Sequence, residues 1–189
     1  VDLSDHPVKL AQEHLDALKA IVGEEGFSVS DYDRLAVAYG FTAYDILRLR
    51  HKIIDSVPDV VLYPDTTEQV EKIVAYSTEH DIPLYVYGGG SSVTRGVEPV
   101  KGGISLDMRR RFNKVLSFNE IDQTITVQAG MSGPDLEKTL QNAPELFGAK
   151  RQYTCGHFPQ SFEYSSVGGW TVTRGAGQNS TYYGCIADI

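Results

Sequence analysis

The chain has 189 residues, of which 41% are apolar and 22% are charged, and its net charge is −8. These values predict one globular domain or two small ones and argue against a disordered chain. The negative charge argues against a nucleic-acid partner and leaves no polybasic patch for a membrane surface. No apolar run reaches the roughly 18 residues of a membrane-spanning helix, and residues 1–5 lack the features of a signal peptide.

We expect a helical segment over residues 1–55. The first helix begins at Asp5–Pro7, because proline is tolerated in the first turn, and it ends at Gly23. Two more helices cover about residues 31–39 and 43–51. Their apolar positions are predicted to face the core, and their arginines are predicted to face solvent; these are Leu35, Ile46, Leu47 and Leu49, and Arg34, Arg48 and Arg50.

Residues 56–108 are predicted to form a first α+β subdomain. A strand at residues 60–63 precedes a helix capped by Thr66, and residues 84–87 form the next strand. A further strand follows at residues 104–107. The order strand, helix, strand places any binding turn at the carboxyl end of the second strand, where ligand loops of α/β sheets commonly lie.

That position holds the most informative stretch, Gly88-Gly89-Gly90-Ser91-Ser92-Val93. Glycine allows positive φ and close approach of a ligand to the backbone amides, and the serines add hydroxyl donors, which suits a phosphate or diphosphate. The stretch is neither a P-loop, since it lacks the required lysine, nor a Rossmann fingerprint, since Val93 stands at the third glycine position. We reject Asp107 as a ribose-binding acid because no helix pattern follows the glycines.

Residues 109–189 are predicted to form a second, incomplete α+β subdomain. Residues 114–118 and 124–128 form a hairpin, and Ser132-Gly133-Pro134 opens a helix. The run Arg109–Arg111 is interpreted as a solvated corner, with a phosphate contact as the alternative. Residues 154–189 are too dense in glycine and hydroxyl side chains to build a core helix or strand by themselves, so we expect ligand-lining loops there. The aromatic side chains of this region are expected to seek burial; these are Phe162, Tyr164, Trp170, Tyr182 and Tyr183.

Two further features of this region bear on chemistry. His157 is expected to pack or hydrogen-bond locally rather than to form a general-base pair with Glu163. Cys155 and Cys185 lack partners at metal-ligand spacing, so we predict no metal site and two reduced thiols, with a disulfide between them as the alternative.

The two glycine-bearing blocks together resemble a known family. Residues 58–70 with 88–93, and then Gly156-His157-Phe158-Pro159-Gln160 through Trp170 and Thr173–Gly177, are similar to the PCMH-type FAD-binding domain of the vanillyl-alcohol-oxidase superfamily. The second block looks like the alkyldihydroxyacetonephosphate synthase and FAD-linked oxidase branch. The D-lactate dehydrogenase branch usually has a Gly-Gly-Asn stretch where Gly168-Gly169-Trp170 stands here. The implied fold is α+β, with two subdomains, the flavin site between them and a helical segment in front.

The resemblance implies that both blocks close around the diphosphate of FAD. The implied contacts are Tyr87, Gly88, Gly89, Gly90, Ser91, Ser92, Val93, Gln160, Ser161, Tyr164, Ser165, Ser166, Gly168, Gly169, Thr173, Arg174, Gly175 and Ala176. Because residues 88–95 contain no His or Cys, we predict noncovalent FAD. In the family the flavin domain continues past the position of Ile189, and the catalytic Tyr, Arg and His lie beyond it, so no catalytic residue is assigned here.

Three readings of the function remain open. The first is a synthase-like flavoenzyme that exchanges the fatty acid of acyl-dihydroxyacetonephosphate for a fatty alcohol through an adduct at flavin N5. The second is an FAD-linked oxidase or dehydrogenase of a 2-hydroxy acid or other alcohol. The third is a cofactor-binding piece without catalysis of its own, for which we expect weak FAD retention.

The resemblance also implies the substrate class, the partners, the assembly and the location of the full-length protein. These are a small-molecule or lipid-like substrate, no nucleic acid, peripheral membrane contact through regions outside this chain, a homodimer, and a cytoplasmic location that becomes peroxisomal in a eukaryote.

Overall fold

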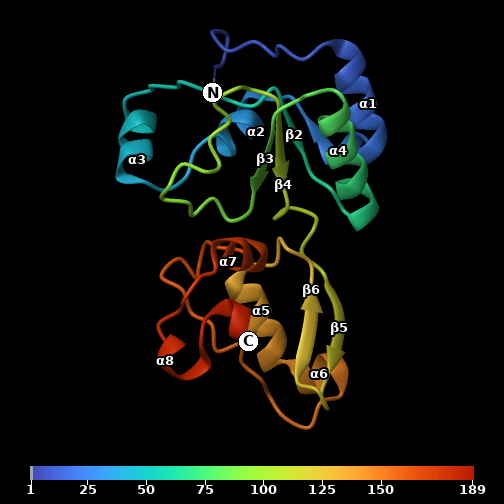
Figure 1. Ribbon diagram of the computed structural model, residues 1–189, viewed down its shortest axis with the longest axis vertical. Helices are drawn as coiled ribbons and strands as arrows, with labels where there is room; N and C mark the ends of the chain where they lie inside the picture. Colours follow the sequence, from blue (N-terminus) through green and yellow to red (C-terminus); the bar gives the residue numbers. More distant parts are fainter. Residues whose placement is uncertain (1) are drawn as a thin grey trace. The chain divides into compact units, whose positions relative to one another are not determined.

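The computed structural model describes residues 2–189, and the chain divides into two compact units, one up to Arg111 and one from Phe112. Both units combine helices with strands, which confirms the predicted α+β class (Figure 1). No helix among the described residues is long and apolar enough to cross a bilayer.

The first unit is built on a four-stranded sheet with the order β1-β2-β4-β3, in which β2, β4 and β3 run parallel and β1 is antiparallel. Helices α1 and α4 pack together on one side of the strands, and α2 lies on the other side (Figure 1). The elements are α1 (Gln12–Val22), η1 (Glu24–Gly26), β1 (Phe27–Ser28), α2 (Asp31–Ala36), α3 (Ala43–Arg50), β2 (Val60–Leu62), α4 (Thr67–Glu79), β3 (Leu84–Tyr87) and β4 (Ile104–Asp107).

The core of this unit follows from the strand sequences. All three residues of β2 are fully buried, as expected for a central parallel strand that is covered on both faces. Val61 and Tyr63 pack with Val37 and Tyr87 into one cluster. Because the parallel strands end at the same edge, Tyr63, the glycine stretch and residues 108–111 all lie at that edge.

The predicted start of the first helix is wrong, because α1 begins at Gln12 and not near Pro7. The backbone N–H of Leu3 donates to Asp31 at 3.0 Å, and that of Lys9 donates to Asp59 at 2.6 Å. These tertiary hydrogen bonds hold the first residues in an irregular path instead of a helical turn. The helix ends at Gly23, with φ of 75°, as predicted.

The predicted orientation of α3 is also wrong, and in α2 it is wrong for Arg34 but not for Leu35, which packs against the cluster of Leu3, Ala38, Tyr39 and Val57. Arg34 and Arg48 are each only 3% exposed, whereas Ile46, Leu47 and Leu49 are exposed by 39–50%. Arg50 is exposed, as predicted. Short helices contribute little packing area of their own, so the hydrogen-bond partners of the arginines decide which face is turned inward.

Each buried arginine finds acceptors far away in the sequence. The Nε of Arg34 donates to the carbonyl of Pro58 at 2.7 Å, and its terminal nitrogen donates to the carbonyl of His6 at 2.8 Å. Arg48 reaches the carboxylate of Glu98 at 3.0 Å. Neither acceptor set can be read from helical periodicity.

The second unit packs a β-hairpin against short helices, and the hairpin confirms the prediction for residues 114–128. Its core contains Met131, Leu136, Leu140 and Trp170, and residues of both hairpin strands pack against them. The elements are β5 (Val115–Asn119), β6 (Thr124–Val127), α5 (Gly133–Gln141), α6 (Ala143–Phe147), α7 (Val167–Thr173), α8 (Ser180–Tyr183) and η2 (Ile186–Asp188).

The expectation that residues 154–189 contribute no core helix is wrong, because α7 buries Trp170. Gly168 makes this possible, since a Cβ at that position would lie 2.7 Å from the Cβ of Ala129. Ser166 caps the helix by accepting a hydrogen bond from the N–H of Gly169 at 3.3 Å. The small residues therefore allow close helix packing around one large side chain.

Candidate functional site: two glycine-bearing segments

Gly90, three residues after the end of β3, has a backbone conformation that only glycine adopts easily. Gly90 is buried with φ of 70°, and a Cβ there would lie 2.0 Å from the hydroxyl oxygen of Tyr87. Tyr87 is itself buried, so its ring has little room to move away. Both the backbone angle and the available space therefore require glycine at this position.

The amides of this stretch are available to a ligand. Among residues 2–189, no acceptor takes a hydrogen bond from the backbone N–H groups of residues 89–93, although most of these residues are half-buried or buried. Buried or half-buried N–H groups normally have a partner. Consecutive unpaired N–H groups form a binding site for an anion such as a diphosphate.

The charged groups at the same edge of the sheet are paired locally. Asp107 is 3% exposed, and burial raises its pKa, although Arg109, whose guanidinium lies 3.8 Å from the carboxylate, opposes the shift. Arg110 lies over the ring of Tyr63 at 4.6 Å, and Arg111 lies 3.8 Å from Asp65. Arg109 and Arg110 are exposed and Arg111 is half-buried, which fits the predicted solvated corner.

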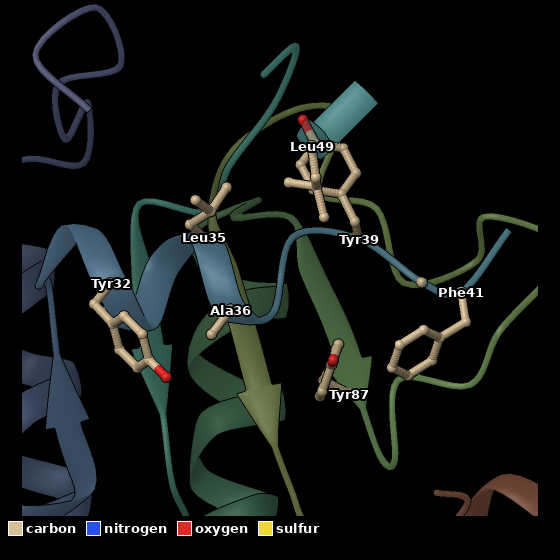
Figure 2. A pocket seen from close by; sticks show the side chains of 8 residues that line it. Tyr32, Leu35, Ala36, Tyr39, Phe41, Leu49 and Tyr87 are labelled. Atoms are coloured by element: carbon tan, nitrogen blue, oxygen red, sulfur yellow. The ribbon is translucent and has the colours of Figure 1, made fainter. Parts of the chain in front are cut away.

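An apolar pocket of about 300 Å³ lies beside the glycine stretch within the first unit. Figure 2 shows that its wall comes from α2, the segment after α2, α3 and the end of β3. It is lined by Tyr32, Leu35, Ala36, Tyr39, Gly40, Phe41, Leu49 and Tyr87. The sequence did not predict this pocket, because Leu35 and Leu49, which line it, were expected to face the core.

In the second unit, three of the implied FAD contacts have structural roles. The hydroxyl of Ser165 accepts a hydrogen bond from the indole N–H of Trp170 at 2.6 Å, Ser166 caps α7, and Gly168 packs against Ala129. Ser165 and Ser166 are 5% and 2% exposed. Their oxygens are therefore held rigidly, while the side chains exposed to solvent are those of Gln160, Tyr164, Thr173, Arg174 and Ala176.

His157 lies inside the second unit, 1% exposed, and its ring packs against Trp170 at a centroid distance of 4.9 Å. Neither ring nitrogen has a hydrogen-bond partner in the described part of the chain. The local packing that we expected is present, and no contact with Glu163 accompanies it. Cys155 and Cys185 are both free thiols, and no cluster of metal-ligating side chains occurs among residues 2–189.

We expect His157 to make the stability of the protein depend on pH. Burial lowers the pKa of His157 below 6.5, so the unfolded chain binds a proton more readily than the folded one. The stabilisation from neutral His157 is complete above about pH 6.5 and is lost as the pH falls toward the folded pKa. Urea unfolding at about pH 7.5 and about pH 5.5 should show a smaller loss for His157→Gln than for the wild type. Equal losses would contradict this assignment.

The unpaired amides of residues 89–93 suit an anionic group such as the diphosphate of FAD. The protein has a net charge of −8, and neutral N–H donors can hold the two phosphate charges of FAD without a cluster of Lys or Arg. Unpaired amides at the carboxyl edge of a parallel sheet supply such donors. The α+β fold and the unpaired amides together suit a cofactor that carries phosphate groups.

Comparison with known proteins gives the family. The model of the FAD-binding domain family matches residues 58–189. The chain therefore belongs to the FAD-binding domain family, and FAD is its cofactor. The helical segment in front of residue 58 lies outside the matched region.

The similar proteins include alkyldihydroxyacetonephosphate synthases. The enzyme of that name from Dictyostelium discoideum is 33% identical over 97% of this chain, which covers 29% of the Dictyostelium protein. A solved structure of an alkyldihydroxyacetonephosphate synthase matches with a TM-score of 0.88 and 32% identity over 97% of this chain and 32% of that one. A mitochondrial cytochrome-type D-lactate dehydrogenase from Saccharomyces cerevisiae is 28% identical over 99% of this chain and 30% of its own length. The chain thus spans about a third of the proteins that it resembles.

Proposed function

We propose that this chain is the FAD-binding portion of a flavoenzyme of the alkyldihydroxyacetonephosphate synthase type. The reaction would replace the fatty acid of acyl-dihydroxyacetonephosphate by a fatty alcohol and so form an alkyl ether without net redox change. The observation that carries the proposal is the TM-score of 0.88 over 97% of the chain, which includes the segment in front of the family match.

In this proposal both glycine-bearing segments hold FAD. The amides of residues 89–93 would donate to the diphosphate, and the loop of residues 160–166 with residues 173–176 would add donors along the cofactor. Bound FAD would supply a flavin ring for electron transfer or covalent chemistry with a substrate. The role of this chain is to bind and orient that ring, and Trp170 supports the role by fixing Ser165 through its indole N–H.

The second candidate is an FAD-linked oxidase or dehydrogenase of a 2-hydroxy acid, which the 28% identity to the D-lactate dehydrogenase supports. The resemblance at Gly168-Gly169-Trp170 favours the synthase, because the dehydrogenase branch usually has a Gly-Gly-Asn stretch at this place. The full-length protein distinguishes the two. Ether-lipid product from acyl-dihydroxyacetonephosphate and a long-chain alcohol supports the synthase, and flavin bleaching by a 2-hydroxy acid supports the oxidase.

We expect FAD to be bound without a covalent link. Residues 88–95 contain no His or Cys that could form a bond to the flavin ring. Acid precipitation of the full-length holoenzyme should therefore leave all flavin in the supernatant, measured by absorbance. A yellow protein pellet would contradict this expectation.

The surroundings of the enzyme are part of the same proposal. We propose a lipid-like substrate, peripheral contact with a membrane through regions outside this chain, a homodimer at full length, and a cytoplasmic location, or a peroxisomal one in a eukaryotic cell. The match to lipid-related synthases supports the substrate class. Sedimentation and fractionation of the full-length protein test the assembly and the location.

A further inference from the structure

A buried arginine joins the helical segment to the stretch that follows the glycines. The guanidinium of Arg48, on α3, lies over the rings of Tyr39 at 4.7 Å and Tyr44 at 5.3 Å, and the residue is only 3% exposed. The residue lies ten positions before the region matched by the FAD-binding family, which begins at residue 58. Its role is therefore not part of the match.

The carboxylates around Arg48 come from both segments. Its terminal nitrogens contact Asp45 at 3.4 Å, Glu98 at 3.0 Å, and also Asp55. Glu98 is 5% exposed and also accepts from the Nε of Arg95 at 2.6 Å. Burial alone would lower the pKa of Arg48, but its hydrogen bonds to Glu98 and Asp55 raise it overall, so the guanidinium stays charged.

The Arg48–Glu98 pair is one tether between the helical segment and the chain after β3, and a second tether lies closer to the glycines. The backbone N–H of Phe41 donates to the carbonyl of Ser92 at 3.0 Å. A Cβ on Gly40 would lie 2.3 Å from the same carbonyl oxygen, so only glycine permits this approach. The helical segment therefore holds the chain at Ser92, inside the glycine stretch, and again at Glu98, six residues later.

Such contacts matter because a glycine-rich stretch loses much conformational entropy when it becomes ordered. Glycine has the largest conformational entropy of any residue, and the amides of residues 89–93 have no acceptor among the described residues to orient them. A ligand that has to order the loop on binding loses affinity by the cost of that ordering. Contacts that order the loop beforehand increase affinity.

We propose that residues 39–56 are a positioning element of the cofactor site, in which the Arg48–Glu98 pair and the Gly40–Ser92 contact preorganise the glycine stretch for FAD. The proposal rests on the proposed role of residues 89–93 as diphosphate donors. Arg48 and Gly40 are positioning residues, because they act on the glycine stretch through Glu98 and Ser92 and are assigned no contact with the cofactor.

The test compares two buried arginines of the same unit in the full-length protein. Arg48→Met removes the tether, and Arg34→Met is the matched control, because Arg34 is equally buried but donates to Pro58 and His6. FAD binding to the apoprotein is followed by flavin fluorescence well below the melting temperature of each variant. We expect both variants to lower the melting temperature, and only Arg48→Met to raise the Kd for FAD, by about tenfold.

Gly40→Ala tests the second tether independently and serves as the alternative if Arg48→Met does not fold. We expect a higher Kd for FAD at an unchanged absorbance maximum of bound flavin, because the loop and not the flavin environment is altered. Equal Kd values for Arg48→Met and Arg34→Met, or an unchanged Kd for Gly40→Ala, would overturn the proposal. If Gly90→Ala also leaves the Kd for FAD unchanged, then residues 89–93 do not hold the diphosphate, and the proposed cofactor site fails together with the proposed positioning element.

Discussion

Replacing Trp170 by alanine is expected to lower the free energy of unfolding by about 3–5 kcal/mol. The side chain is 3% exposed and packs among Met131, Leu136 and Leu140, so its removal leaves a cavity in the core of the second unit. The change also leaves the buried hydroxyl of Ser165 without the donor that now lies 2.6 Å away. Urea unfolding followed by circular dichroism measures the loss.

The control for this prediction lies on the same helix. Val172 is 82% exposed, so Val172→Ala should change the free energy of unfolding by no more than about 0.5 kcal/mol. Trp170→Phe should give an intermediate loss, because it keeps most of the apolar volume but not the indole N–H. Similar losses for Trp170→Ala and Val172→Ala would show that α7 is not part of the core.

Replacing Gly90 by alanine is expected to weaken FAD binding by about 10- to 100-fold. A non-glycine residue held at a φ of 70° is strained, and the new Cβ would meet the Tyr87 hydroxyl at 2.0 Å. The loop has to move to relieve both, and the amides of residues 89–93 move with it. The Kd for FAD, measured on the full-length apoprotein, gives the effect.

Gly96→Ala, three residues after the glycine stretch, is the matched control. Nothing lies within 4 Å of a Cβ at Gly96, and its φ is not in the left-handed region. The same chemical change should therefore leave the Kd for FAD within about twofold of the wild type. If both variants bind FAD as the wild type does, residues 89–93 do not hold the cofactor.

The regular elements around the glycine stretch could be predicted because their signals are local. Thr66 accepts a hydrogen bond from the N–H of Gln69 at the start of α4, and Ser132 caps α5 in the same way. The run Val60–Leu62 is apolar at every position, which matches a central strand with both faces covered. Caps, turns and short apolar runs act over a few residues, so the sequence states them directly.

The small antiparallel strand β1 escaped prediction for the opposite reason. Phe27 and Ser28 form only two residues of strand, and their pairing with Leu62 and Val61 spans more than thirty positions. No periodicity can appear in two residues. Only the presence of β2 nearby makes them a strand.

By itself the sequence determined the class of the protein: an α+β chain, its strands apart from β1, its helix caps, and two glycine-bearing segments that resemble those of an FAD-binding domain. The tertiary structure decided what the charged and small residues do. Periodicity assigned Arg48 to the surface and Leu49 to the core, and the fold reverses both, because three carboxylates close around the guanidinium. Glycine density likewise argued against a core helix at α7, although close approach to Ala129 is what Gly168 provides. Local sequence patterns indicate which backbone conformation a segment prefers. The acceptors of a buried arginine, and the residue that packs against a glycine, are brought into place only when distant segments of the chain meet.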